Sequence, residues 1–167
     1  GDPLDPKTQM GAMVDDVHTR RVMGYIEAGK KEGAKLAMGG KQVHIDNAGS
    51  FIEPTVFDNV DNKMKIAQEE IFGPVLSVIP VKDAEQALTV ANDTIYGLAS
   101  AIFTSDINKA FKFAKGLRSG SVWVNTYDGG DITTPFGGYK QSGNGRDKSL
   151  HAFDKFTQIK TTWIQLG

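Results

Sequence analysis

An alternation of short apolar runs with helical periods in the second half of the chain restricts the fold more than any other feature. Residues 75–81, 98–103 and 121–124 are apolar runs of strand length. The segments between them begin at Asp83 and Asp106, which are good helix caps, and their apolar residues follow helical spacing. This strand–helix–strand–helix–strand order predicts an α/β fold with a parallel βαβαβ sheet, right-handed crossovers and cover on both faces.

A long glycine-rich loop, residues 126–148, follows the third strand. It is longer than a simple connector in a compact domain, and loops of this kind usually carry function. It leaves the carboxyl end of a parallel strand, which is where open α/β sheets bind ligands. A mobile surface loop with Phe136 tucked into the core is the alternative, and the two interpretations weigh about equally on physical grounds.

The first half of the chain has a weaker pattern. Prolines at 3 and 6 predict an extended entry over residues 1–13. A helix is expected over residues 16–32, and short strands and turns over 34–60, with breakers at Gly39–Gly40 and at Asn47–Gly49. The helix is expected to bury one face, formed by Val14, Val17, Val22, Tyr25, Ile26 and Gly29.

The carboxyl-terminal segment predicts two further elements. A short helix is expected near residues 149–155. Residues 156–166 are rich in Thr, Ile and Trp and predict one long strand. A terminal strand exposes unpaired backbone groups unless another strand pairs with it.

Composition excludes several classes of protein. The chain has 19 Lys and Arg against 20 Asp and Glu, which argues against a protein that binds nucleic acid by neutralising phosphates. Its longest apolar stretch is too short to span a bilayer. The absence of cysteine excludes disulfides, thiolate metal sites and a cysteine nucleophile within the chain, and it is compatible with the cytoplasmic location that we expect. The first residues are neither a start methionine nor a signal peptide, so the chain is expected to be part of a longer protein.

Most catalytic motifs are missing from the sequence. There is no dinucleotide fingerprint, and the three histidines are far apart, so no metal site is expected. Ser149 and His151 resemble a nucleophile and its base, but no third group that would orient the histidine is apparent. We therefore expect no catalytic residue here.

Two adjacent carboxylates, Glu69 and Glu70, precede Phe72 and a rigid Gly-Pro turn. One functional interpretation is that a carboxylate accepts two hydrogen bonds from a diol such as a ribose, with the aromatic packed on a ring. Taken alone, however, the segment favours the simpler interpretation, a solvated pair of carboxylates with Phe72 in the core.

Taken together, these segments resemble the aldehyde dehydrogenase superfamily. The most specific matches are Glu-Glu-Ile-Phe-Gly-Pro at residues 69–74 and Pro-Phe-Gly-Gly-Tyr-Lys-Gln-Ser-Gly at residues 135–143. Further matches occur in the order of the family at residues 1–6, 53–57, 92–99 and 120–125. The tail from residue 147 onward is most similar to the γ-glutamyl-γ-aminobutyraldehyde dehydrogenases of putrescine breakdown.

The resemblance implies the carboxyl-terminal part of an enzyme that uses NAD or NADP. In that family a cysteine thiolate attacks the aldehyde, hydride leaves the thiohemiacetal for NAD(P)+, and the thioester is hydrolysed. The Rossmann-type domain, the cysteine and the general base lie upstream of Gly1 in that scheme. This chain alone is therefore expected to be inactive.

The resemblance also assigns binding roles. Glu70 matches the carboxylate that binds the nicotinamide ribose, and Phe72 matches the aromatic beside it. The residues that match the substrate tunnel are Thr126, Asp128, Gly130, Asp131 and Phe136. Anionic groups attract cationic amines, so the two aspartates suggest an amino- or γ-glutamylamino-aldehyde as substrate.

Departures from the family matter as well. Glycines at 129 and 130 replace an aromatic and predict a wider, less apolar tunnel mouth. Asp147 and Gln158 each replace a glutamate, which puts a water-positioning role at 147 and an interface role at 158 in doubt.

The resemblance divides the chain into residues 1–155, part of the catalytic domain, and residues 156–167, an oligomerisation strand. That strand pairs across subunits in the family, which predicts a homodimer or homotetramer; we expect no nucleic-acid or membrane partner. The alternative is a non-catalytic α/β binding or oligomerisation module. A cysteine-bearing loop and a dinucleotide fold encoded upstream of Gly1 would favour the enzyme.

Overall fold

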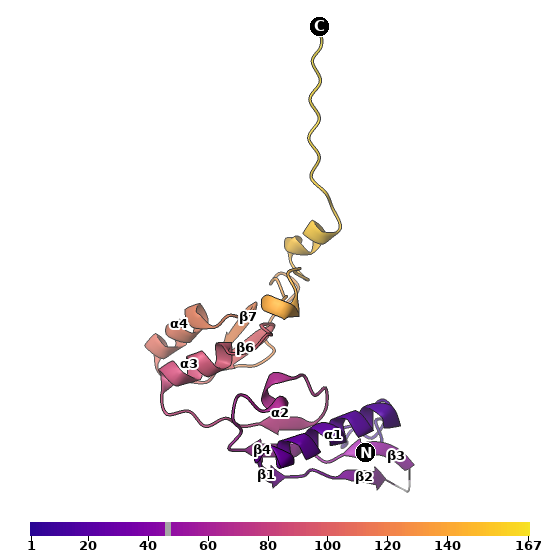
Figure 1. The fold of residues 1–167 in the computed structure, drawn as a ribbon. Helices are drawn as coiled ribbons and strands as arrows, with labels where there is room; N and C mark the ends of the chain where they lie inside the picture. The colour runs from indigo at the N-terminus through magenta and orange to yellow at the C-terminus, as the bar shows by residue number, and fades with distance from the viewer. Residues whose placement is uncertain (46–47) are drawn as a thin grey trace. The chain divides into compact units, whose positions relative to one another are not determined.

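The computed structural model describes residues 1–45 and 48–167 and divides into two compact units, Gly1–Lys82 and Asp83–Gly167 (Figure 1). The first unit contains α1 (Asp16–Lys31), β1 (Lys35–Met38), β2 (Gln42–Ile45), β3 (Ala48–Ile52), β4 (Thr55–Asp58), α2 (Lys65–Gln68) and β5 (Val75–Ser77). The second contains α3 (Ala84–Asn92), β6 (Ala99–Ile102), α4 (Ile107–Gly116), β7 (Ser121–Val124) and the 3₁₀ turns η1 (Lys140–Ser142) and η2 (Leu150–Lys155). Of the expected breakers, Asn47 lies outside the described residues.

Helix α1 begins where the sequence predicts, because the Asp15 side chain accepts the His18 backbone N–H at 2.7 Å. Its buried face is narrower than expected. Val22, Tyr25 and Ile26 are buried, whereas Val14 and Val17 are exposed, so the expectation for those two was wrong. Val14 precedes the helix, and Val17 lies five residues before Val22, which places it roughly 140° away around the helix axis.

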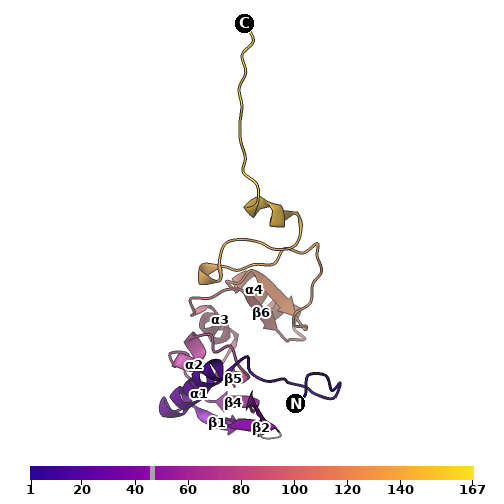
Figure 2. The same ribbon diagram turned by 90° about the vertical axis from the view of Figure 1, so that its right-hand side faces the viewer.

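The core of the first unit forms between α1 and a three-stranded sheet. Strand β4 is central, antiparallel to β1 and parallel to β5. Helix α1 lies beside α2 in both ribbon views (Figure 2). The buried apolar cluster consists of Val22, Tyr25, Ile26, Ala34, Ile52, Phe57, Val60, Ile66 and Ile71. Phe57 is fully buried in this cluster, and full burial of a side chain of this size contributes about 1.5–3 kcal/mol to stability.

The second unit confirms the predicted strand–helix–strand arrangement around α4. Strands β6 and β7 pair in parallel, from Ala99 opposite Ser121 to Ile102 opposite Val124. Asp83 accepts the Gln86 N–H at 2.8 Å and so begins α3, as expected. Asp106 likewise begins α4 by accepting the N–H groups of the two residues after Ile107.

The predicted βαβαβ sheet is only partly found. Strand β5 pairs with β4 in the first unit, and the sheet of the second unit contains β6 and β7 among the described residues. A short apolar run predicts a strand but not its neighbour, and β4 supplies β5 with a partner inside its own unit. The expected cover on both faces is also incomplete, because the side chains of β6 and β7 are half-buried or exposed.

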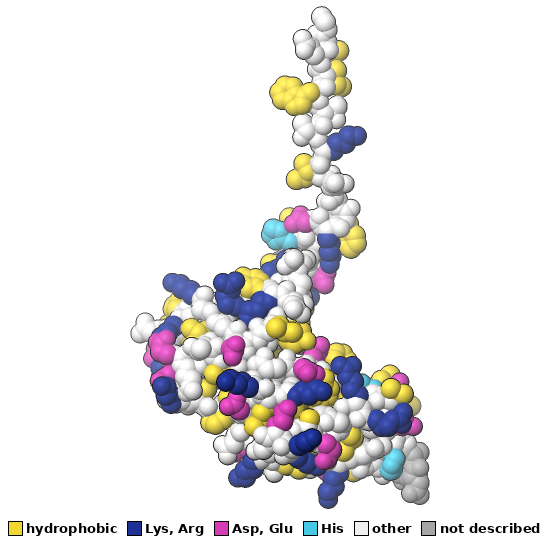
Figure 3. All heavy atoms as spheres, in the orientation of Figure 1, with side chains coloured by type: hydrophobic (Ala, Val, Ile, Leu, Met, Phe, Trp, Pro, Cys, Tyr) yellow, Lys and Arg dark blue, Asp and Glu magenta, His cyan; other side chains and the backbone are white. Residues whose placement is uncertain are grey.

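The expected terminal strand is absent from the described structure. Residues 157–167 form no helix or strand, and their apolar side chains reach solvent: Ile159 is 98% exposed and Trp163 is 94% exposed (Figure 3). Strand propensity alone does not hold a strand, because its N–H and C=O groups need a paired neighbour.

Candidate functional site

The first candidate site residues lie in the turn between α2 and β5. Phe72 has a positive φ of 58°, and its side chain is 73% exposed, while the neighbouring Ile71 is 8% exposed and belongs to the core. The interpretation of Phe72 as a core residue was therefore wrong. A left-handed backbone at a bulky residue costs on the order of 1–3 kcal/mol and persists only where surrounding contacts hold it.

His18 supplies those contacts. Its Nε2 lies 2.7 Å from the carbonyl oxygen of Phe72, and the two rings meet edge to face with centroids 6.1 Å apart. His18 sits in the first turn of α1, where Asp15 fixes the backbone. Sequence reasoning missed this residue because it lies 54 positions from Phe72 and no local pattern connects the two.

The two adjacent glutamates have different surroundings. The Glu69 carboxylate accepts a hydrogen bond from the Tyr25 hydroxyl at 2.8 Å and lies 3.9 Å from the Lys65 ammonium. The Glu70 side chain is exposed and has no hydrogen-bond or ion-pair partner among residues 1–45 and 48–167. A carboxylate in this state can accept hydrogen bonds from a diol. The exposed Phe72 ring follows two residues later in the same turn and offers an aromatic surface.

The second set of candidate residues lies on the loop after β7, whose later part is hydrogen-bonded to the segment between α3 and β6. The Tyr139 N–H donates to the Gly97 carbonyl at 2.8 Å, as does the Gly120 N–H at 3.1 Å. The Lys140 ammonium donates to two carbonyls at the end of α3 and just beyond it. A Cβ atom at Gly120 would collide with the carbonyl oxygen of Gly137, so a glycine is what permits this close approach.

A cavity of about 450 Å³ opens between this loop and β7. Three of the predicted substrate residues, Asp128, Gly130 and Phe136, line it, whereas Thr126 and Asp131 are not among its lining residues. Trp123 and Lys148 also line the cavity, although the sequence did not suggest either. The Trp123 indole donates to the Gly129 carbonyl at 2.5 Å and packs on the Tyr127 ring, which fixes one wall.

The Asp131 carboxylate makes hydrogen bonds within the loop itself. It accepts the hydroxyl of Thr133 at 2.5 Å and the backbone N–H of the same residue at 2.7 Å. The hydroxyl bond, then the backbone bond, and at longer range the charge of Lys148 lower the pKa of Asp131 from its ordinary value of 3.8. The carboxylate therefore holds the turn before Thr134, and its role in binding substrate stays a prediction.

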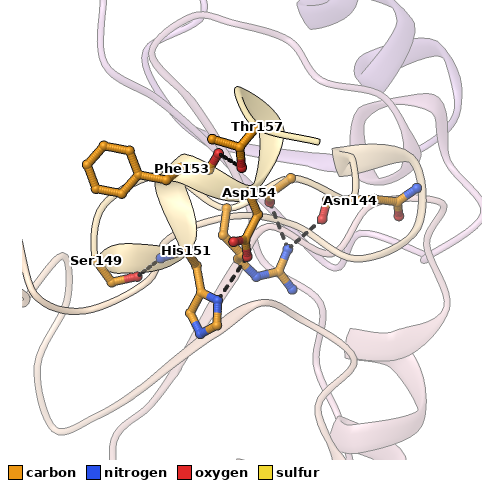
Figure 4. Close-up of polar contacts among 8 residues, drawn as sticks. Asn144, Ser149, His151, Phe153, Asp154 and Thr157 are labelled. Atoms are coloured by element: carbon orange, nitrogen blue, oxygen red, sulfur yellow. Dashed lines mark hydrogen bonds and ion pairs between the residues drawn. The ribbon is translucent and has the colours of Figure 1, made fainter. Parts of the chain in front are cut away.

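The residues around η2 do not form a catalytic group (Figure 4). Ser149 Oγ accepts the backbone N–H of His151, while the His151 ring contacts the Asp154 carboxylate at 3.1 Å. Asp154 is thus the orienting group that the sequence did not reveal. The ring makes no hydrogen bond to the serine hydroxyl among the described residues, so a nucleophile–base pair is not assembled.

No group of three His, Asp or Glu side chains in residues 1–45 and 48–167 is placed to hold a metal ion. Within those same residues, no helix has the length and apolar character needed to cross a membrane. Glu70 and Phe72 belong to the first unit, and the cavity belongs to the second.

Comparison with known proteins gives a consistent result. A family profile described as Aldehyde dehydrogenase family matches residues 1–162. The chain is 49% identical over 166 residues to the NADP/NAD-dependent aldehyde dehydrogenase PuuC of Escherichia coli (strain K12), covering 99% of this chain and 33% of that protein. The chain therefore spans about a third of the length of the curated relatives that it matches.

Solved structures agree with the sequence comparison. An indole-3-acetaldehyde dehydrogenase in complex with NAD+ superimposes with a TM-score of 0.94 and 60% identity, over 99% of this chain and 34% of that one. The γ-glutamyl-γ-aminobutyraldehyde dehydrogenase of Burkholderia cenocepacia J2315 gives a TM-score of 0.91 and 56% identity, over 97% of this chain and 33% of that one.

Proposed function

This chain belongs to the aldehyde dehydrogenase family, and on that premise we propose that it is part of an enzyme that oxidises an aldehyde to a carboxylate with NAD+ or NADP+. The chain contributes the turn between α2 and β5, which would bind the ribose of the cofactor, and one wall of the substrate cavity. The chain itself has no cysteine, so the nucleophile of the proposed reaction lies in the rest of the full-length protein.

The observation that carries this proposal is the exposed Phe72 ring, two residues after a Glu70 carboxylate that has no partner among the residues that the structure describes. An aromatic residue held at positive φ with its ring in solvent is costly, and such strain is typical of ligand sites. The arrangement is suited to a sugar diol followed by a flat ring, which is the chemistry of the nicotinamide riboside half of NAD(P)+.

We assign the following roles to the residues of the turn. Glu70 accepts hydrogen bonds from the ribose hydroxyls and so fixes the sugar, while Phe72 packs on the ring and restricts its rotation. His18 holds the Phe72 backbone through its carbonyl. When bound, NAD(P)+ supplies the acceptor for the hydride that leaves the substrate carbon.

The substrate proposal rests on the cavity after β7. Asp128 places a negative charge among the aromatic walls formed by Trp123 and Phe136. This combination favours an aldehyde with an apolar stem and a cationic group, such as an amino- or γ-glutamylamino-aldehyde. One similar solved enzyme is named for a γ-glutamylamino-aldehyde, and another is named for indole-3-acetaldehyde.

We further propose that the enzyme is a homodimer or homotetramer held in part by residues 156–166. This segment presents large apolar side chains to solvent, among them Ile159, Trp163 and Leu166. Pairing with a strand of another subunit would bury those side chains and satisfy the backbone groups.

The direct test is an assay of the full-length protein with a panel of aldehydes and either NAD+ or NADP+. We expect aldehyde-dependent formation of the reduced cofactor, and no activity from the 167-residue chain alone. A folded full-length protein that reduces neither cofactor with any aldehyde of the panel would overturn the proposed function.

A further inference from the structure

Lys148 is among the residues that line the cavity, and its backbone conformation is unusual. Lys148 has a positive φ of 58°, and the next residue, Ser149, also has a positive φ, of 53°. Two consecutive left-handed residues without glycine are costly. Such a bend needs strong support from its surroundings.

That support comes from both sides of Lys148. Asp147 exchanges two backbone hydrogen bonds with Phe136, at 2.7 and 2.8 Å. The Ser149 N–H donates to the Ile132 carbonyl at 2.6 Å. The backbone on each side of Lys148 is thus tied to the loop that forms the cavity, and the lysine is held at the cavity wall.

The ammonium group of Lys148 lies 5.8 Å from the centroid of the Phe136 ring, and both side chains line the cavity. Its charge also contributes to the lowered pKa of Asp131, which lies outside the cavity lining. Lys148 and Asp128 both line the cavity, yet they form no ion pair within the part of the chain that the structure describes. The cavity therefore presents one positive and one negative side chain.

The neighbouring cationic side chains, Arg146 and Lys155, are engaged in hydrogen bonds or ion pairs within the loop and η2. Arg146 donates to the carbonyls of Gly138 and Gly145, each at 2.9 Å. Lys155 pairs with the Asp147 carboxylate. Of the cationic side chains between residues 146 and 155, only Lys148 is among the lining residues of this cavity.

We propose that Lys148 is a specificity-determining residue that binds a carboxylate at the far end of the substrate. Asp128 then faces an ammonium group on the same end, so the preferred substrate is an aldehyde that terminates in an amino acid. This inference rests on the proposed function and narrows its substrate class. A substrate with only a cationic group would be attracted by Asp128 but repelled by the positive charge of Lys148, whereas an added carboxylate would bind Lys148.

The test uses the full-length protein and four aldehydes: butyraldehyde (neutral), 4-aminobutyraldehyde (cationic), succinic semialdehyde (anionic) and γ-glutamyl-γ-aminobutyraldehyde (zwitterionic). In Lys148→Gln we expect the KM ratio of zwitterionic to neutral aldehyde to rise about tenfold, the typical effect of losing a hydrogen bond to a charged group. The corresponding ratio for the anionic aldehyde should rise as well, and the ratio for the cationic aldehyde should fall. Lys148→Arg should restore most of the preference because it keeps the charge.

The matched control is Lys109→Gln, which removes an exposed lysine from α4 in the same unit. It should leave all four KM values within about twofold of the wild-type values. Equal KM changes for all four aldehydes in Lys148→Gln, or no change in the ratios, would overturn the role of Lys148 while leaving the proposed function intact. A wild-type protein that oxidises none of the four would instead overturn the proposed function and this inference with it.

Discussion

The backbone of Phe72 adopts a conformation that bulky side chains avoid, and a histidine from a distant helix supports it. His18 contacts both the carbonyl and the ring of Phe72. The Tyr25 hydroxyl donates to the neighbouring Glu69, whereas Glu70 has no partner within residues 1–45 and 48–167. The residue-level geometry therefore separates two adjacent glutamates that look equivalent in the sequence.

The first prediction concerns these two glutamates. Glu70→Gln keeps the size of the side chain but loses its charge and one acceptor, so the ribose should be held less firmly. We expect single-turnover hydride transfer in the full-length protein to slow about 10- to 100-fold, because small misplacements of a reacting group have effects of this size. Stopped-flow measurement of reduced-cofactor formation checks this rate.

Glu69→Gln is the control for that experiment, since its amide oxygen can still accept the Tyr25 hydroxyl. Its hydride-transfer rate should stay within about twofold of the wild-type rate. Equal slowing in both variants, or none in Glu70→Gln, would count against the role of Glu70.

The second prediction concerns the titration of Asp131. Its folded-state pKa is lowered by Thr133, so the ionised carboxylate stabilises the loop above the unfolded pKa, and this contribution is lost as the pH falls through the lowered folded pKa. We expect the Asp131 carboxyl carbon to titrate below pH 3.8 by NMR. Thr133→Val removes the hydroxyl donor and should move the midpoint upward. A wild-type midpoint at or above the ordinary value would contradict this assignment.

Close contact between two elements depends on a glycine at the start of β7. The loop segment at residues 137–138 lies so near Gly120 that a Cβ atom has no room. We expect Gly120→Ala to lower the free energy of unfolding of the full-length protein by about 1–3 kcal/mol, as overpacking does elsewhere. Urea unfolding measures the change.

Gly129→Ala provides the matched comparison, because its added Cβ would lie 3.6 Å from the nearest atom at an ordinary contact distance. It should change the unfolding free energy by less than about 0.5 kcal/mol. If Gly120→Ala lowers the unfolding free energy no more than Gly129→Ala does, the loop does not pack closely against Gly120.

Local chemistry explains which elements the sequence could predict. The caps at Asp83 and Asp106 and the helical spacing after them act within one turn, so α3 and α4 were predicted correctly. Strand partners depend on contacts distant in sequence, so the pairing of β5 with β4 was not foreseen. The same limit applies to the site: Glu70 and Phe72 belong to a local motif, whereas His18 and Lys148 join their sites only through the fold.

At the scale of the whole molecule, the exposed apolar surface is concentrated in the second unit and its tail. Phe103, directly after β6, and Phe111, in α4, have exposed side chains. Along the tail, the side chains of Ile159, Trp163 and Leu166 are exposed. Exposed apolar surface of this extent is typical of an interaction surface. The chain spans about a third of the length of its curated relatives, and in the proposed oligomer the rest of the enzyme and a second subunit would cover this surface.

The final prediction separates backbone pairing from side-chain burial in the tail. If residues 156–166 form a strand against another subunit, every second N–H faces that partner, and a proline there removes a donor and breaks the ladder. Of the neighbours Thr161 and Thr162, only one would direct its N–H toward the partner strand. One of the two variants Thr161→Pro and Thr162→Pro should therefore raise the monomer fraction of the full-length protein, as measured by size-exclusion chromatography with light scattering. Thr161→Val keeps the N–H and favours a strand, so it should assemble like the wild type. Assembly of both proline variants at the wild-type level would mean that the tail contributes side-chain burial only, since its backbone would then carry no hydrogen bond that assembly requires.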